Sequence, residues 1–278
     1  MTEITAHHGL FKNTDLHVDD TGGPGRPVVL VHGWPLSGAS WSEQVPALTA
    51  AGYRVVTYDR RGFGRSDKTR SGYDYDTLTE DLNALLEQLD LHDVTLVGFS
   101  MGGGEVARYV GTHGTERLRS VVFAGAVPPY MAKTEDNPQG PLTKEQADEM
   151  EAGLKDDEDT FYDGFITTFF SADGELKVSQ AQRQDALALT KQADHKAALK
   201  SMESFGTTDF REDLPKITVP TLVIHGDSDA VVPLEGSGAL THAAVAGSRL
   251  HVVAGAPHGF NVSHAEEFNR VLLEFLAD

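Results

Sequence analysis

The sequence predicts an α/β fold, in which a mostly parallel sheet is covered by helices on both faces. Short apolar runs rich in β-branched residues alternate along the chain with longer amphipathic segments, the pattern of strand–helix–strand units. The chain has 278 residues, 40% of them hydrophobic, which suits one α/β domain carrying an insertion. Ligands of such sheets bind at the carboxyl ends of the parallel strands, so functional residues are expected at that edge.

The first third of the chain supplies four of these elements. Residues 14–19 alternate apolar and polar with a period of two, which predicts a half-exposed antiparallel strand at the edge of the sheet. The apolar runs at 27–31 and 54–58 predict buried parallel strands. Residues 75–89 predict a helix, because leucines recur there at three- and four-residue steps and form one apolar stripe.

A candidate nucleophile lies where the next strand ends. Residues 94–99 form a β-branched run that leads into the pentapeptide GFSMG at 98–102, and residues 105–112 predict a helix. A strand, G-x-S-x-G and a helix in this order expose a serine at a sharp turn, beside the N–H groups that begin the helix. Ser100 is therefore the candidate nucleophile, and the alternative is a glycine-rich connection that happens to contain a serine.

An activated serine needs a histidine base, and the base needs an orienting acid, in the chain order Ser, Asp, His. Further strands are predicted at 118–124, 221–224 and 249–253. The second of these runs into a polar loop that contains Asp227 and Asp229. Asp229 has the reach expected of the orienting acid, whereas Asp227 stands where a short polar side chain most often builds a turn.

His258 is the candidate base among twelve histidines. It lies in a loop after the last predicted strand, held between Pro257 and Gly259. His251 lies within that strand instead, and His264 lies at a predicted helix start.

The donors that would bind an oxyanion are expected from an early loop. The strand at 27–31 runs into His-Gly, and Gly33 allows the backbone to turn its N–H groups inward. The backbone N–H groups of Trp34 and Met101 are the candidate donors, since Pro35 has no N–H to offer.

The middle of the chain has a different organisation. Residues 127–216 open with several prolines and contain an acidic helical stretch at 144–159, so we interpret them as a helical cap inserted into a core formed by residues 1–126 and 217–278. Aromatic residues spaced for one helix face follow: Phe161, Tyr162, Phe165, Phe169 and Phe170. Phe165, Phe169 and Phe170 are the predicted pocket residues, and the alternative is that they only attach the cap to the core.

These residues resemble the α/β-hydrolase superfamily, and most of all its branch of cofactor-free haloperoxidases (perhydrolases), aryl esterases and related lactonases or lactamases. The segments that carry the resemblance follow one another in the family's order over nearly the whole chain, at 32–41, 58–66, 98–109, 225–229 and 257–259. The resemblance implies the α/β-hydrolase fold with a mostly parallel, eight-stranded sheet. It places the nucleophile, acid and base on Ser100, Asp229 and His258.

The resemblance implies a serine hydrolase that cleaves small carboxylic esters through an acyl-enzyme, without cofactor or metal. If hydrogen peroxide replaces water, the product is a peracid, so perhydrolase side activity is expected. The alternatives are a lactonase or amidase of the same mechanism, or a non-catalytic hydrolase fold that binds a small molecule. Dehalogenases and epoxide hydrolases share the fold but carry an aspartate where Ser100 stands.

Two glycine-rich stretches match nucleotide-binding patterns only loosely. Residues 102–107 fit G-x-G-x-x-A, but the following strand at 118–124 does not end in the acidic residue that a dinucleotide site requires. Residues 62–67 lack both the third glycine and the Walker lysine.

Composition limits the partners. The net charge of −19 repels phosphate backbones and anionic lipid, so neither nucleic acid nor a membrane is expected as a partner. The chain has no cysteine, which excludes disulfides and thiolate metal sites. The first residues lack the pattern of a signal peptide, and no apolar run approaches membrane-spanning length. We therefore expect a cytoplasmic protein acting on a small-molecule ester, with a homo-oligomer left open.

Overall fold

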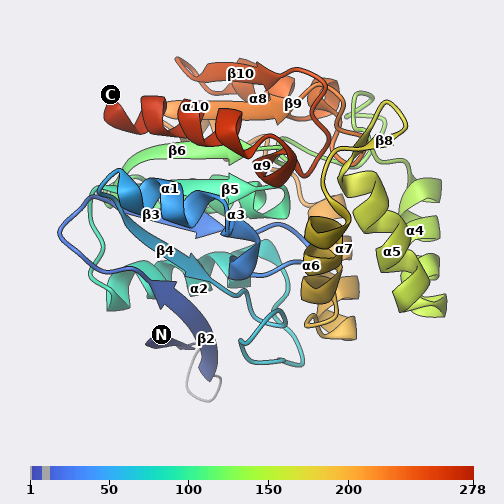
Figure 1. Ribbon diagram of the computed structural model, residues 1–278, viewed down its shortest axis with the longest axis horizontal. Helices are drawn as coiled ribbons and strands as arrows, with labels where there is room; N and C mark the ends of the chain where they lie inside the picture. Colours follow the sequence, from blue (N-terminus) through green and yellow to red (C-terminus); the bar gives the residue numbers. More distant parts are fainter. Residues whose placement is uncertain (1, 8–12) are drawn as a thin grey trace.

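The computed structural model describes residues 2–7 and 13–278, which form an α/β structure around one eight-stranded sheet (Figure 1). The strand order is β1-β2-β4-β3-β5-β6-β9-β10, and all neighbours from β4 to β10 run parallel. The strands are β1 (Thr2–His7), β2 (Asn13–Asp20), β3 (Pro27–Val31), β4 (Arg54–Tyr58), β5 (Val94–Phe99), β6 (Leu118–Ala124), β9 (Thr221–Gly226) and β10 (Arg249–Val253).

The first two strands correct the prediction for residues 14–19. β2 is antiparallel, as predicted, but it is not the edge of the sheet, because β1 pairs with it from Thr2↔Val18 to His7↔Asn13. On its other side β2 pairs with β4, for example at Val18↔Tyr58. The alternation of buried and exposed residues in β2 reflects burial of one face of the sheet, and it does not indicate whether a second strand, here β1, pairs with β2.

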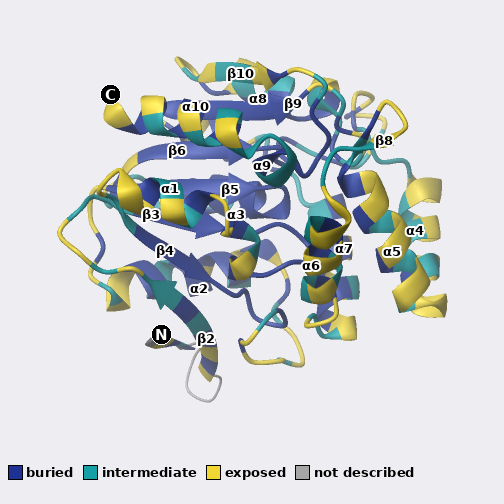
Figure 2. Cartoon of the chain, in the orientation of Figure 1, coloured by how far each residue is buried: buried dark blue, intermediate teal, exposed yellow. Residues whose placement is uncertain are grey.

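Helices cover both faces of the sheet. α1 (Gln44–Ala50) contacts α10 (Ala265–Ala277) on one face, while α2 (Tyr75–Gln88) contacts α3 (Met101–His113) on the other. The remaining short helices are η2 (Gly38–Trp41), η4 (Leu234–Gly236), α8 (Gly238–Ala244) and α9 (Phe260–Ser263), while η3 (Leu214–Lys216) lies at the end of the segment between β6 and β9. Figure 2 shows the central strands buried and the outer faces of these helices exposed.

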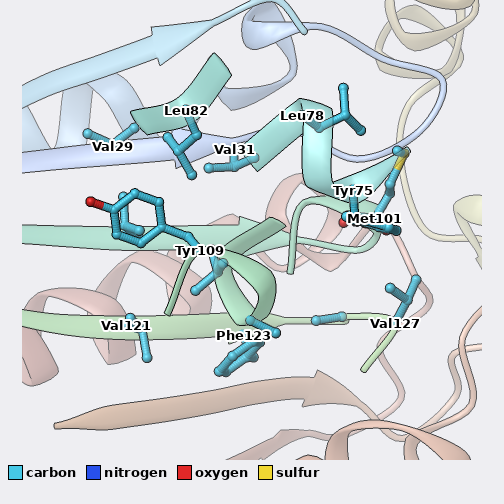
Figure 3. Packing of buried hydrophobic residues seen from close by; sticks show 14 of the residues in the cluster. Val29, Val31, Tyr75, Leu78, Leu82, Met101, Tyr109, Val121, Phe123 and Val127 are labelled. Atoms are coloured by element: carbon cyan, nitrogen blue, oxygen red, sulfur yellow. Dashed lines mark hydrogen bonds between the residues drawn. The ribbon is translucent and has the colours of Figure 1, made fainter. Parts of the chain in front are cut away.

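The two faces hold two separate hydrophobic clusters, because successive side chains of a strand point in opposite directions. In β3, Val29 and Val31 join the cluster under α2 and α3, where Figure 3 shows them near Leu82. Val28 and Leu30 join the cluster under α1 and α10. A strand covered on both sides therefore reads as a continuous apolar run, as the sequence of β3 does.

The segment between β6 and β9 contains α4 (Lys144–Asp156), α5 (Glu158–Phe169), β7 (Ser171–Ala172), β8 (Glu175–Leu176), α6 (Gln180–Thr190) and α7 (His195–Thr207). Figure 1 shows these helices beyond the arrowheads of the parallel strands, at the carboxyl edge of the sheet. The acidic stretch predicted as one helix is two, because the Asp157 side chain accepts the N–H of Thr160 and caps α5.

Candidate active site

Ser100 occupies the turn between β5 and α3 in a conformation that few side chains adopt. Its φ is 54° and its ψ is −120°, so the backbone is strained at this residue. Three backbone hydrogen bonds hold it there: Ser100 donates to Ala124 O (2.9 Å) and accepts from the N–H groups of Gly103 (3.0 Å) and Val127 (3.2 Å). The backbone of Ser100 is thus held at the tip of the turn by main-chain hydrogen bonds alone.

The glycines on either side allow the turn to close. A Cβ at Gly98 would lie 2.5 Å from the carbonyl oxygen of Gly102, and a Cβ at Gly102 would overlap the carbonyl oxygen of Val31. α3 begins at Met101 and includes the three glycines at 102–104, whereas the sequence predicts the helix from residue 105. Glycine is a poor helix former, but here the close approach to β3 leaves no room for another residue.

His258 lies between Ser100 and Asp229. Its Nε2 is 2.9 Å from Ser100 Oγ, and its Nδ1 is 2.6 Å from Asp229 Oδ2. The imidazole is 1% exposed and packs against the rings of Phe99 and Phe169, with centroid distances of 5.1 and 5.0 Å. With the proton on Nδ1 donated to the carboxylate, Nε2 is the acceptor for the serine hydroxyl.

Asp229 is held in place by backbone donors. Its Oδ1 accepts the N–H groups of Val231 (2.9 Å) and Val232 (2.7 Å), which leaves Oδ2 for His258. Burial raises the pKa of Asp229, but the contacts with His258 and His225 outweigh burial and hold the pKa well below the usual carboxyl range. Asp229 is therefore ionised at neutral pH.

The structure brings Asp229 and not Asp227 to the imidazole. Asp227 is exposed, and its Oδ1 accepts the N–H of Gly255 (2.7 Å) and the hydroxyl of Ser228 (3.1 Å). These are the bonds of a side chain that shapes a turn, the role that its sequence position favours.

Two other histidines that the sequence offered, His251 and His264, have partners outside the Ser100–His258–Asp229 group, whereas His225, which the sequence analysis did not single out, lies beside Asp229. His251 contacts Glu267 (2.8 Å), and His264 precedes α10. His225, at the end of β9, is fully buried, and its Nε2 lies 2.8 Å from Val232 O and 3.4 Å from Asp229 Oδ2. The available signal was its position two residues before Asp227 and four before Asp229, at the carboxyl end of a buried strand.

The two candidate oxyanion donors come from the segments that follow β3 and β5. Gly33 O accepts from His32 Nδ1 (2.8 Å) and from the N–H of Leu36 (3.1 Å), so the N–H of Trp34, in the same peptide, points the opposite way. This N–H has no backbone acceptor in the part of the chain that the structure describes. Met101 is the first residue of α3, so its N–H has no acceptor within the helix.

A buried ion pair beneath this loop ties it to α3. Arg60 donates from Nε to Glu105 Oε1 (2.6 Å) and from Nη2 to His32 O (2.7 Å), and the Tyr58 hydroxyl donates to Glu105 Oε2 (2.7 Å). Burial, followed by the positive charge of Arg60, holds the pKa of His32 well below its ordinary value of 6.5. Neutral His32 can therefore donate from Nδ1 to Gly33 O while its Nε2 accepts the N–H of Arg60 (3.0 Å).

A cavity of about 40 Å³ opens beside Ser100. The residues that line it are Trp34, Ser100, Val127, Met131, Leu142, Met150, Phe165, Phe205, Val231 and Val232. Of the three predicted pocket aromatics only Phe165 lines this cavity. Phe169 packs on the His258 ring, and Phe170 lies where a Cβ at Gly259 would be, so both support the loop that carries the imidazole.

Sequence reasoning missed most of the cavity wall. Val127 comes three residues after the end of β6, and Val231 and Val232 come two and three residues after Asp229, so their places beyond strand ends at the carboxyl edge were a usable signal. Met131, Leu142 and Met150 come from the segment without recognisable motifs.

The site shows no metal-binding arrangement. Within residues 2–7 and 13–278, no three or more His, Cys, Asp or Glu side chains are grouped so that they could hold a metal ion. In the same ranges, no helix is long and apolar enough to cross a bilayer.

Comparison with known proteins agrees with this architecture. Residues 26–265 match the α/β hydrolase fold family, and the chain belongs to that family. The family and fold predicted from the sequence motifs are thereby confirmed.

Individual relatives are similar over nearly their whole length. The chain is 45% identical over 257 residues to the non-heme chloroperoxidase CPO-A1 of Kitasatospora aureofaciens, covering 91% of this chain and 93% of that protein. It is 38% identical over 280 residues to a bifunctional esterase/perhydrolase of Acinetobacter calcoaceticus, covering 99% of both. A bromoperoxidase structure from Bacillus anthracis superposes with a TM-score of 0.95 at 52% identity, covering 100% of both chains.

Proposed function

We propose that this chain is a serine hydrolase that cleaves small carboxylic esters through an acyl-enzyme and passes the acyl group to water or to hydrogen peroxide. The observation that carries the proposal is the continuous contact from Ser100 Oγ through His258 to Asp229 Oδ2, with distances of 2.9 and 2.6 Å. A nucleophile in reach of a base, and a base oriented by a buried carboxylate, is the arrangement that acyl transfer requires.

In the first half of the reaction, Ser100 Oγ attacks the ester carbonyl and His258 Nε2 takes the hydroxyl proton. Asp229 keeps the imidazole in the productive tautomer and stabilises the imidazolium. The N–H groups of Trp34 and Met101 bind the oxyanion, and one such donor contributes about 3–4 kcal/mol in enzymes of this kind. His258 then returns the proton to the leaving alcohol.

In the second half, His258 activates water or hydrogen peroxide, which attacks the acyl-enzyme. Water gives the carboxylic acid, and hydrogen peroxide gives the peracid. Two relatives support the second route, since one is named an esterase/perhydrolase and the other a non-heme chloroperoxidase. A peracid released into solution oxidises halide, so one acyl-transfer site accounts for both names.

The cavity supports short acyl groups as substrates. One water molecule needs about 10–15 Å³ of such volume, so a cavity of about 40 Å³ holds roughly three waters or an acyl group of two or three carbons. Its wall is almost entirely apolar, which favours an uncharged alkyl chain over a carboxylate or an ammonium group.

We also propose that residues 127–216 act as a cap over this cavity and that the enzyme works in the cytoplasm. The cap assignment is supported by the lining residues that this segment contributes, such as Met131 and Phe205. The net charge of −19 supports a small-molecule substrate over nucleic acid or an anionic membrane.

The experiment is a panel of p-nitrophenyl esters from acetate to octanoate, run with and without hydrogen peroxide. Peracid is followed separately through the bromide-dependent bromination of monochlorodimedone. We expect the highest kcat/KM for the shortest esters, and peracid only when ester and peroxide are both present. A short lactone and a p-nitroanilide are assayed beside the esters. Turnover of the lactone or the anilide alone favours a lactonase or an amidase, and turnover of none of the compounds favours the non-catalytic binder.

A further inference from the structure

Two of the side chains that line the cavity beside Ser100 are thioethers. The chain has five methionines, and two of them, Met131 and Met150, line the same cavity as Ser100. Leucine would supply similar apolar surface, as Leu142 does on the same wall. A thioether differs from leucine chiefly in being oxidisable to a polar sulfoxide.

The segment that carries Met131 is fixed by hydrogen bonds on both sides. The Met131 carbonyl accepts the N–H of Leu142 (2.9 Å), and the Asn137 side-chain amide donates to Tyr130 O (3.0 Å) and Ala132 O (2.7 Å). Met131 is 4% exposed, and Met150, on α4, is half-buried and packs against the core. Both side chains therefore belong to a wall that bound substrate cannot avoid in so small a cavity.

We propose that Met131 and Met150 are modification sites, at which peracid formed on Ser100 oxidises the enzyme before the peracid leaves. This inference rests on the peracid-forming half of the proposed function, with hydrogen peroxide as co-substrate. The terminal oxygen of RCO3H is transferred to the thioether sulfur: the O–O bond breaks and an S–O bond forms. Sulfur is oxidised by two electrons, the peracid is reduced to RCO2H, and the proton stays on the carboxylic acid.

The modification limits the same reaction that causes it. A sulfoxide places a polar oxygen in a cavity of about 40 Å³ whose wall is otherwise apolar, so it fills space and disfavours an alkyl chain. The enzyme should therefore lose activity in proportion to peracid turnover and not to peroxide exposure alone.

The other methionines provide an internal control. Met202, on α7, is 6% exposed, close to the 4% of Met131, but it does not line the cavity. Met101 is fully buried beside Ser100 and also lies outside the lining. Oxidation governed by accessibility alone would affect Met202 and Met131 alike.

The test incubates wild-type enzyme with a short ester and hydrogen peroxide, together with nitrogen-15-labelled S100A in the same tube. Peptide mass spectrometry then measures sulfoxide at each methionine in both proteins, and monochlorodimedone bromination measures peracid in parallel. We expect sulfoxide at Met131 and Met150 of the wild type to exceed that in S100A, and that at Met202, by at least several-fold. Peroxide without ester should oxidise the wild type and S100A alike.

The outcomes separate the inference from the function on which it rests. If peracid forms but Met131 and Met150 oxidise no faster than Met202, or equally in S100A, the inference is overturned and the proposed function stands. If no peracid forms, the perhydrolase half of the proposed function fails, and the inference fails with it. A double variant, Met131→Leu and Met150→Leu, should keep a larger fraction of its own starting activity during turnover with peroxide, and loss at the wild-type rate would contradict the link to inactivation.

Discussion

Replacing Asp229 by asparagine separates orientation of the imidazole from support of the loop. The asparagine side chain would retain an oxygen to accept the N–H groups of Val231 and Val232, at 2.9 and 2.7 Å in the structure, so the loop should keep its shape. The amide NH2 would then stand where Oδ2 now lies 2.6 Å from His258 Nδ1. Because both groups would be donors, the imidazole should move its proton to Nε2, where it can no longer accept the proton of Ser100.

The size of the effect distinguishes this account from the loss of one ordinary hydrogen bond. A wrong tautomer costs about four orders of magnitude in kcat in another serine triad, which corresponds to about 5.5 kcal/mol of transition-state stabilisation. The loss of one neutral hydrogen bond costs only about 0.5–1.5 kcal/mol, or roughly tenfold in rate.

The assay is p-nitrophenyl acetate hydrolysis by wild type, D229N and D227N, with thermal unfolding to confirm that each variant is folded. D227N is the matched control, since it makes the same chemical change two residues away, on an exposed carboxylate that only shapes a turn. We expect D229N to lose about 10⁴ in kcat and D227N to keep measurable turnover of the wild-type order. A larger loss in D227N, or a loss of only tenfold in D229N, would refute the reasoning.

Three further predictions test the turn, the cavity and the oxyanion loop. Gly102→Ala should abolish turnover or folding, because its Cβ would overlap a main-chain oxygen of β3. Gly164→Ala, inside α5 with open space around it, should instead stabilise the protein by about 0.5–1 kcal/mol in thermal unfolding. Normal activity of the Gly102→Ala variant would contradict the close packing at the turn. Phe165→Ala should raise kcat/KM for longer acyl chains relative to acetate, because Phe165 lines the cavity. Phe170→Ala should cost about 3–5 kcal/mol of stability without changing the preference for acyl-chain length. The same chain-length preference in Phe165→Ala as in the wild type would exclude Phe165 from the acyl site. Because the pKa of His32 is depressed in the folded chain, below pH 6.5 the unfolded chain binds a proton that the folded chain does not. His32 alone should therefore lower the free energy of unfolding by about 1.4 kcal/mol for each unit by which the pH falls. His32→Asn should flatten that slope in denaturant titrations between pH 6.5 and 5, and an unchanged slope would contradict a neutral buried His32.

The features that could be predicted from the sequence are those that local chemistry forces. A strand buried on both faces needs a continuous apolar run, and the turn at Ser100 needs glycines where a Cβ would collide with Gly102 O or Val31 O. The placing of acid and base at one edge of the sheet follows from parallel strands whose carboxyl ends meet there. Strand burial and the close packing of the turn each constrain only a few neighbouring residues, so both can be recognised from a short stretch of sequence.

The features that could not be predicted depend on contacts between distant segments. The sequence of β2 does not show that β1 pairs with it. A strand buried on one face alternates apolar and polar residues whether it is the edge of the sheet or has a neighbour on both sides. The helical spacing of the aromatics places Phe165 and Phe169 one turn apart on the same face of α5. Only the packing of α5 against the rest of the chain decides that Phe165 lines the cavity and Phe169 supports His258. Met131 reaches the cavity through a segment whose course is set by its bonds to Leu142.

The central claim is that Ser100 is the nucleophile of an acyl-transfer enzyme, and covalent labelling tests it most directly. Wild-type enzyme and S100A are treated with a serine-directed fluorophosphonate, and the adduct is located by peptide mass spectrometry. The structure, with Ser100 Oγ 2.9 Å from His258 Nε2, predicts one adduct on Ser100 of the wild type and none on S100A. Equal labelling of both proteins, or an adduct on another residue of the wild type, would contradict it.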